Sequence, residues 1–179
     1  MYLSRVLLDI RRRSTMTAMA KPNVFHGAIE SSFQPYSQER LLWRLDELRG
    51  QNYLLLLSGS EPDLSGLVKQ FGQEGENAFQ TKDYEPLLQR VVQGDSWHFR
   101  LAANPTRSIK NSPAEQGRGS VVAHVTREQQ REWLLARAEK HGFALSPGNF
   151  DVVRNEWKEF RKHERQRYPV SFKMALYEG

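Results

Sequence analysis

The chain has 179 residues, of which 39% are hydrophobic and 11% aromatic, which is enough apolar material for one large domain or two small ones and excludes a globally disordered protein. The net charge of +5 and a pI near 9.6 favour an anionic partner, either a nucleic acid or a membrane surface. The absence of cysteine excludes disulfides, thiol catalysis and zinc sites with cysteine ligands.

The first ten residues predict a half-buried strand and not a signal peptide. Val6, Leu8 and Ile10 share one face, charged residues interrupt the run, and an arginine cluster follows it at 11–13. No stretch approaches the roughly 20 apolar residues that span a bilayer. We therefore expect a soluble, cytoplasmic protein with no membrane partner.

A helix and two strands follow. Pro22 fits the first position of a helix over residues 22–33, and strands are predicted at 40–46 and 53–57. Residues 61–93 carry a weaker pattern, which fits a short helix and the end of a first unit.

The second half predicts a similar series of elements. A strand begins near Ser96, and residues 121–125 either continue it or pair with it. Thr126 and Gln129 form a capping-box signal for a helix that Gly142 ends. Strands follow at 150–157 and 170–177; the second alternates cleanly through Val170, Phe172, Met174 and Leu176.

The order strand, helix, strand, strand thus occurs twice, which indicates an α+β protein with two tandem ferredoxin-like domains of βαββαβ order. We place the domains at residues 1–88 and 94–179. The second copy lacks its last helix and strand because the sequence stops at Gly179, so we expect a further C-terminal segment in the full protein.

The sequence does not indicate a metal site or a phosphate-binding loop. Of the five histidines, His26 has the best ligand spacing, with Glu30 one helical turn further on, but no third ligand lies nearby in sequence. The glycines at 72–75 lack the Lys-Ser/Thr ending of a phosphate-binding loop. We expect neither a metal nor a cofactor.

His26 is open to two interpretations. It follows Phe25 and so lies beside the apolar stripe of its helix, as an ordinary boundary histidine does. Alternatively, an imidazole with an unperturbed pKa of about 6.5 suits proton transfer near neutrality. RNA carries its own nucleophile, the 2′-hydroxyl, so one histidine can support its cleavage without a metal.

Basic residues gather at two places in the second half. The stretch 154–168 joins two predicted strands and is either a solvated charged ribbon or a basic finger that contacts RNA phosphates. The second place is the loop after Pro105, which is rich in Gly, Ser and Asn. The candidate RNA-binding residues are Lys158, Arg161, Lys162, Arg165 and Arg167 of the stretch and Arg107, Lys110 and Arg118 of the loop.

Read in order, these segments resemble the CasE family, the CRISPR endoribonucleases of type I-E. The resemblance rests on MYLSRV at 1–6, NVFH at 23–26, RLLWRL at 40–45, SEPD at 60–63 and LYEG at 176–179, and above all on FRLAANP at 99–105. It spans essentially the whole chain.

The resemblance implies that His26 is the catalytic general acid or base and that the basic finger grips the stem of a repeat hairpin. It implies metal-independent cleavage that leaves a 2′,3′-cyclic phosphate, with the protein staying on the crRNA 3′ hairpin beside other Cascade subunits. Asn23 stands where family members often have tyrosine, which keeps open a non-catalytic, hairpin-binding subunit. An unrelated ferredoxin-like RNA binder is a third alternative.

Overall fold

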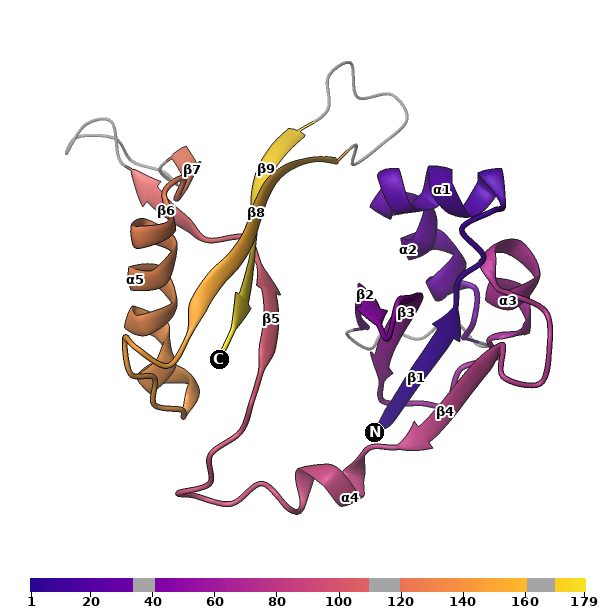
Figure 1. Ribbon diagram of the computed structural model, residues 1–179, viewed down its shortest axis with the longest axis horizontal. Coiled ribbons are helices and arrows are strands. Elements are labelled where there is room, and N and C mark those ends of the chain that lie inside the picture. Colours follow the sequence, from indigo (N-terminus) through magenta and orange to yellow (C-terminus); the bar gives the residue numbers. More distant parts are fainter. Residues whose placement is uncertain (34–40, 110–119, 161–169) are drawn as a thin grey trace. The chain divides into compact units, whose positions relative to one another are not determined.

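The computed structural model describes residues 1–33, 41–109, 120–160 and 170–179, which form two compact units, Met1–Asp95 and Ser96–Gly179 (Figure 1). None of the helices in these ranges is long and apolar enough to cross a membrane.

The first unit is a four-stranded antiparallel sheet with helices packed on one face. Its strands follow the order β2-β3-β1-β4, the antiparallel arrangement of a ferredoxin-like domain. The elements are β1 (Tyr2–Leu7), α1 (Arg13–Ala20), α2 (Pro22–Glu30), β2 (Leu42–Leu48), β3 (Gln51–Ser58), α3 (Ser65–Phe71), β4 (Phe79–Asp83) and the short α4 (Glu85–Leu88). The predicted order strand, helix, strand, strand is therefore confirmed by β1, α2, β2 and β3, with helix α1 in addition. Residues 61–93, whose sequence pattern was weaker, contain α3, β4 and α4.

The core of this unit lies between the sheet and helices α1, α2 and α3. Alternate residues of β1 and β3, such as Val6 and Leu54, point to the helices and are buried. Each helix contributes apolar side chains to the same cluster, including Ala18 and Ile29. Helix α2 packs in this cluster together with α1, α3 and the sheet, and these contacts fix its position.

The N-terminal strand is shorter than predicted, and a helix follows it that the sequence pattern did not indicate. After Leu7 the chain turns, with the Asp9 carboxylate accepting hydrogen bonds from the backbone and the guanidinium of Arg11. Ile10, predicted to share the buried face, is exposed. Helix α1 was missed because it buries the small residues Thr15 and Ala18 and so has no large apolar stripe.

The second unit pairs a three-stranded antiparallel sheet with one long helix. Its sheet has the order β5-β9-β8, and β6 and β7 form a separate two-stranded ribbon. The elements are β5 (Arg100–Ala103), β6 (Thr106–Ile109), β7 (Ser120–Ala123), α5 (Arg127–Ala138), a 3-10 turn (Glu139–His141), β8 (Asp151–Phe160) and β9 (Val170–Glu178). Strand β5 is an edge strand within the described residues.

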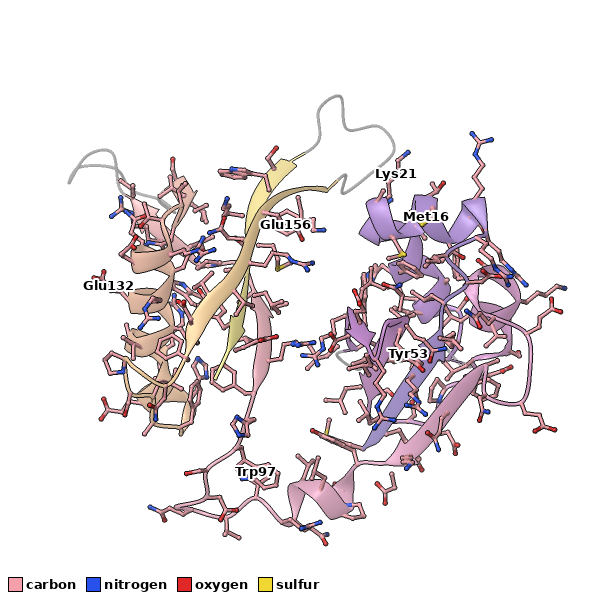
Figure 2. All side chains as sticks on the ribbon, in the orientation of Figure 1. Met16, Lys21, Tyr53, Trp97, Glu132 and Glu156 are labelled. Carbon is pink, nitrogen blue, oxygen red and sulfur yellow. The ribbon has the colours of Figure 1, made fainter. Side chains whose placement is uncertain are left out.

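Two expectations for this unit need correction. The strand expected from Ser96 begins only at Arg100, and Trp97 lies outside it and is exposed (Figure 2). The segment expected to continue or pair with that strand is β7, which pairs with β6 instead. Pro105 separates β5 from β6, because proline cannot donate a ladder hydrogen bond.

The ends of α5 confirm the sequence signals. The Thr126 hydroxyl accepts a hydrogen bond from the Gln129 backbone N–H, and the Gln129 side chain accepts one from the Thr126 backbone N–H. The last turn ends at Gly142 with φ of +80°, a left-handed conformation that favours glycine.

Strands β8 and β9 form a long antiparallel arm that contains one irregularity. The register shifts between Val152 and Arg154, so that Val153 is the extra residue of a β-bulge. Beyond the bulge the described side chains on the face toward α5 are Asn155 and Trp157 of β8 and Ser171, Lys173 and Ala175 of β9.

The apolar alternation of the last strand therefore faces away from the helix. Phe172, Met174 and Leu176 lie half-buried on the opposite face, whereas Ala175 and Tyr177 are fully buried against α5. The Tyr177 hydroxyl donates to the backbone carbonyl of Gln130, and its ring stacks on Trp133 at 6.3 Å between centroids.

Candidate active site and nucleic-acid interface

His26 lies on the solvent side of α2, with its side chain 55% exposed. Its Nε2 is 3.2 Å from Oε1 of Glu30, one helical turn further on. The carboxylate thus orients the imidazole ring, and Nδ1 has no partner within the described part of the chain. An exposed, oriented imidazole is the arrangement that proton transfer to or from a substrate needs.

The opposite side of α2 is anchored in the core. Phe25, the residue before His26, is fully buried between Trp43 of β2 and Phe71 of α3, with ring centroids 6.1 and 5.0 Å away. Tilted aromatic contacts at these separations add to the burial of a large apolar surface. The backbone at His26 is therefore held by three elements of the first unit.

Other polar residues near His26 divide into free and engaged side chains. Asn23 is exposed on the first turn of α2, three residues before His26. The hydroxyls of Ser31 and Ser32 both donate to the backbone carbonyl of Ala28, at 2.8 and 3.2 Å. They cap the end of the helix, and Ser32 is buried.

Acidic and imidazole side chains do not converge on a common point in the described ranges. No group of three or more His, Asp or Glu residues there has the spacing of a metal site. Within the described ranges the contact between His26 and Glu30 is an ion pair of two residues.

The predicted basic finger corresponds to the arm formed by β8 and β9. Lys158 lies on β8, and its Nζ is 2.9 Å from Oε1 of Glu156, on the face of β8 that points away from α5 (Figure 2). The remaining predicted contacts of the finger, Arg161, Lys162, Arg165 and Arg167, lie outside the described residues. The two strands that carry the finger are confirmed as an antiparallel pair.

Of the three basic residues predicted in the preceding loop, Arg107 is described and lies exposed on β6. Lys110 and Arg118 fall in the range 110–119, outside the described residues. Arg107 and Lys158 belong to the second unit, and His26 belongs to the first.

A cluster around His124, between α5 and strand β6, was not predicted from the sequence. The Trp133 indole N–H donates to the Thr106 carbonyl, and the Arg137 guanidinium lies 4.1 Å from the centre of the Trp133 ring. Partial burial lowers the pKa of His124, and the nearby cations of Arg107 and Arg137 lower it further, against the opposite effect of Glu132. The contacts join residues up to 27 positions apart, for which no short motif exists.

A second feature missed from sequence is a pair of facing side chains on the arm. Trp157 of β8 lies opposite Lys173 of β9, and the Lys173 ammonium is 5.4 Å from the centre of the indole ring. Strand pairing creates this contact, and neither residue stands out in the linear sequence.

Comparisons with known proteins agree with this architecture. The model of a family described as "CRISPR associated protein" matches residues 1–179. The CRISPR-associated endoribonuclease Cse3 of Thermus thermophilus is 30% identical over 153 residues, which are 83% of this chain and 66% of that protein. The chain thus spans slightly less than two thirds of the length of this relative.

Solved structures give the same result. A structure of the CRISPR endoribonuclease Cse3 bound to a 19-nucleotide RNA superimposes with a TM-score of 0.79 at 26% identity, covering 100% of this chain and 84% of that one. Thermus thermophilus Cse3 bound to an RNA that represents a pre-cleavage complex superimposes equally well, covering 99% and 82%.

Proposed function

The chain belongs to the CRISPR-associated CasE family, and from this premise we propose that it is an endoribonuclease that binds the hairpin of a CRISPR repeat and cleaves the precursor of crRNA. The observation that carries the proposal is His26, an exposed imidazole on a helix that Phe25 anchors in the core. The similarity to Cse3 structures that contain RNA supports it.

The reaction needs no external nucleophile. The 2′-hydroxyl upstream of the scissile phosphate attacks the phosphorus, the bond from phosphorus to the 5′-oxygen breaks, and the products are a 2′,3′-cyclic phosphate and a 5′-hydroxyl. One proton leaves the 2′-oxygen and one is delivered to the 5′-oxygen. We assign one of these two transfers to His26, as general acid or general base, with Glu30 orienting its ring.

The second unit supplies the RNA-binding surface in this proposal. Lys158, on the arm of β8 and β9, and the basic residues that follow it in sequence neutralise phosphates of the RNA stem in this proposal. Arg107, Lys110 and Arg118 are the further residues that we assign to RNA binding. The catalytic helix thus belongs to an N-terminal domain and the basic hairpin to a C-terminal domain.

We further propose that the protein keeps the crRNA 3′ hairpin after cleavage as a subunit of Cascade in the cytoplasm. A product that remains bound makes the enzyme act once per molecule. The activity and the partners of the whole protein are part of this proposal, since the chain spans 66% of Cse3 of Thermus thermophilus.

One observation favours a second function, a hairpin-binding subunit without catalysis. Asn23 occupies the first turn of α2, where the family often has a tyrosine, and an amide is not a proton donor at neutral pH. In that case the arm would bind RNA and His26 would be a surface residue.

Incubation of the protein with its own repeat RNA in EDTA distinguishes the two functions. The endoribonuclease produces a fragment that ends in a cyclic phosphate, and the binding subunit shifts the RNA in a gel without cleaving it. Cleavage that requires added Mg²⁺ would contradict the mechanism assigned to His26.

A further inference from the structure

Lys173 is a buried cation with no anionic partner among the described residues. The residue is 8% exposed, although it lies on the arm of β8 and β9, where lysines ordinarily extend into solvent. Its one side-chain interaction in the described part of the chain is with the Trp157 ring, 5.4 Å from the ammonium to the ring centre. An indole thus stands where a buried lysine usually has a carboxylate.

Burial of an ammonium group without a counter-charge is unfavourable. The electron-rich face of an indole offsets part of this cost, but only part, because it carries no net charge. The nearest acidic residue of β8 with a described side chain, Glu156, lies on the opposite face and pairs with Lys158. Among the described side chains this site has one buried cation and no anion, which suits it to receive an anion from a ligand.

Trp157 adds an exposed aromatic ring to this site. The residue is 55% exposed, although the adjacent cross-strand pair of the same face, Asn155 and Ala175, is covered by α5 through Gln130. The arm continues past the N-terminal end of α5 (Figure 1). The exposed fraction of Trp157 shows that no described residue covers most of the indole. An exposed aromatic ring beside a cation matches the chemistry of a nucleotide, which offers a flat base and a phosphate.

We propose that Trp157 and Lys173 bind one unpaired nucleotide of the RNA, with the base stacked on the indole and its phosphate on the ammonium. Bases inside an A-form stem are already stacked on one another, so this site selects a nucleotide in the loop or in the single strand that flanks the stem. The inference deepens the proposed function and rests on it, since the RNA is the repeat hairpin.

Substitution of each residue separates the two contacts. Trp157→Ala should weaken binding of the repeat hairpin roughly 5- to 150-fold, and Trp157→Phe should restore part of the loss, because a smaller ring still stacks. Lys173→Met should lower the slope of log affinity against log salt concentration by about 0.7, the share of one phosphate on a single strand. Lys173→Arg should keep the slope.

Two matched controls test whether the effects are local. Trp97→Ala removes a tryptophan that is 48% exposed outside the arm, and Lys140→Met removes an exposed cation from the turn after α5. Neither control should change affinity. Thermal unfolding of Lys173→Met should show equal or higher stability, because the substitution removes a buried charge without a counter-ion.

Altered RNAs show which nucleotide is bound. If the nucleotide lies in a flanking strand, Trp157→Ala has no effect on a blunt hairpin; if it lies in the loop, the effect disappears when a non-nucleotide linker replaces the loop. The inference is overturned if the wild type binds the hairpin and both Trp157→Ala and Lys173→Met bind it equally well with the same salt slope. A wild type that does not bind the hairpin overturns the proposed function as well.

Discussion

Phe25 and His26 are consecutive residues of α2 with opposite surroundings: the phenyl ring is fully buried, and the imidazole is 55% exposed. The helix rotates by about 100° per residue, which turns one side chain to the core and the next to solvent. The position of His26 thus depends directly on the packing of its neighbour.

We expect His26→Ala to abolish cleavage and to leave hairpin binding nearly intact. General acid–base catalysis contributes about 10²–10⁴-fold to rate and little to ground-state affinity. Single-turnover cleavage and gel-shift affinity of the same preparation measure the two effects. Glu30→Gln is the control for orientation and should slow cleavage less than His26→Ala.

A 2′-deoxy nucleotide upstream of the scissile phosphate should block the reaction completely. The substitution removes the nucleophile and leaves the phosphates and the stem unchanged. Cleavage of this RNA by the wild type would show that the nucleophile is not the 2′-hydroxyl and would rule out the mechanism.

Phe25→Ala should destabilise the first unit by about 3–5 kcal/mol, the usual cost of removing a buried phenyl ring. Urea unfolding measures the loss, and cleavage at a urea concentration where the variant stays folded measures the effect on His26. Val24→Ala, at a side chain 36% exposed on the same helix, is the control and should cost much less. Equal costs at the two positions would contradict the packing of α2 described above.

Replacement of both Arg161 and Lys162 by alanine should weaken RNA binding and reduce the slope of log affinity against log salt by roughly 1–2 units. Cleavage at saturating RNA should be spared, because His26 belongs to the other unit. Affinity titrations at several salt concentrations decide the question. An unchanged slope would mean that this stretch is a solvated ribbon.

His124 should make the stability of the second unit depend on pH below neutrality. Burial and the cations of Arg107 and Arg137 lower its pKa in the folded state, so the unfolded chain binds more protons between that value and about 6.5. Stability is therefore full above about pH 6.5 and decreases as the pH falls below it. Chemical unfolding between pH 8 and pH 5 should show a flatter profile for His124→Gln, and identical profiles would refute the assignment.

The sequence predicted the elements whose patterns are local. The apolar run of β3 and the capping box at Thr126 act within a few residues, so neither depends on the rest of the fold. Helix α1 escaped prediction because its burial of Thr15 and Ala18 depends on contacts with a distant segment; the Thr15 hydroxyl, for example, donates to the carbonyl of Phe71.

For the candidate site, the sequence indicated the type of residue better than its surroundings. His26 was selected as a proton-transfer group, and its exposure agrees with that role. The pairing of Lys158 with Glu156, two residues apart on one face of a strand, reduces its availability as a free cation. The facing pair of Trp157 and Lys173 could not be predicted, because it depends on the register between two strands.

The extra residue at Val153 determines which chemistry each surface of the arm presents. From Val152, strict alternation would turn Glu156 and Lys158 toward α5, and the single shift turns Trp157 there instead. Deletion of Val153 would therefore exchange the two surfaces of β8 beyond that point and would remove only one valine from the strand. A related chain that lacks this one residue would have the same sequence motifs. Its arm would nevertheless present the opposite face of β8 to the RNA.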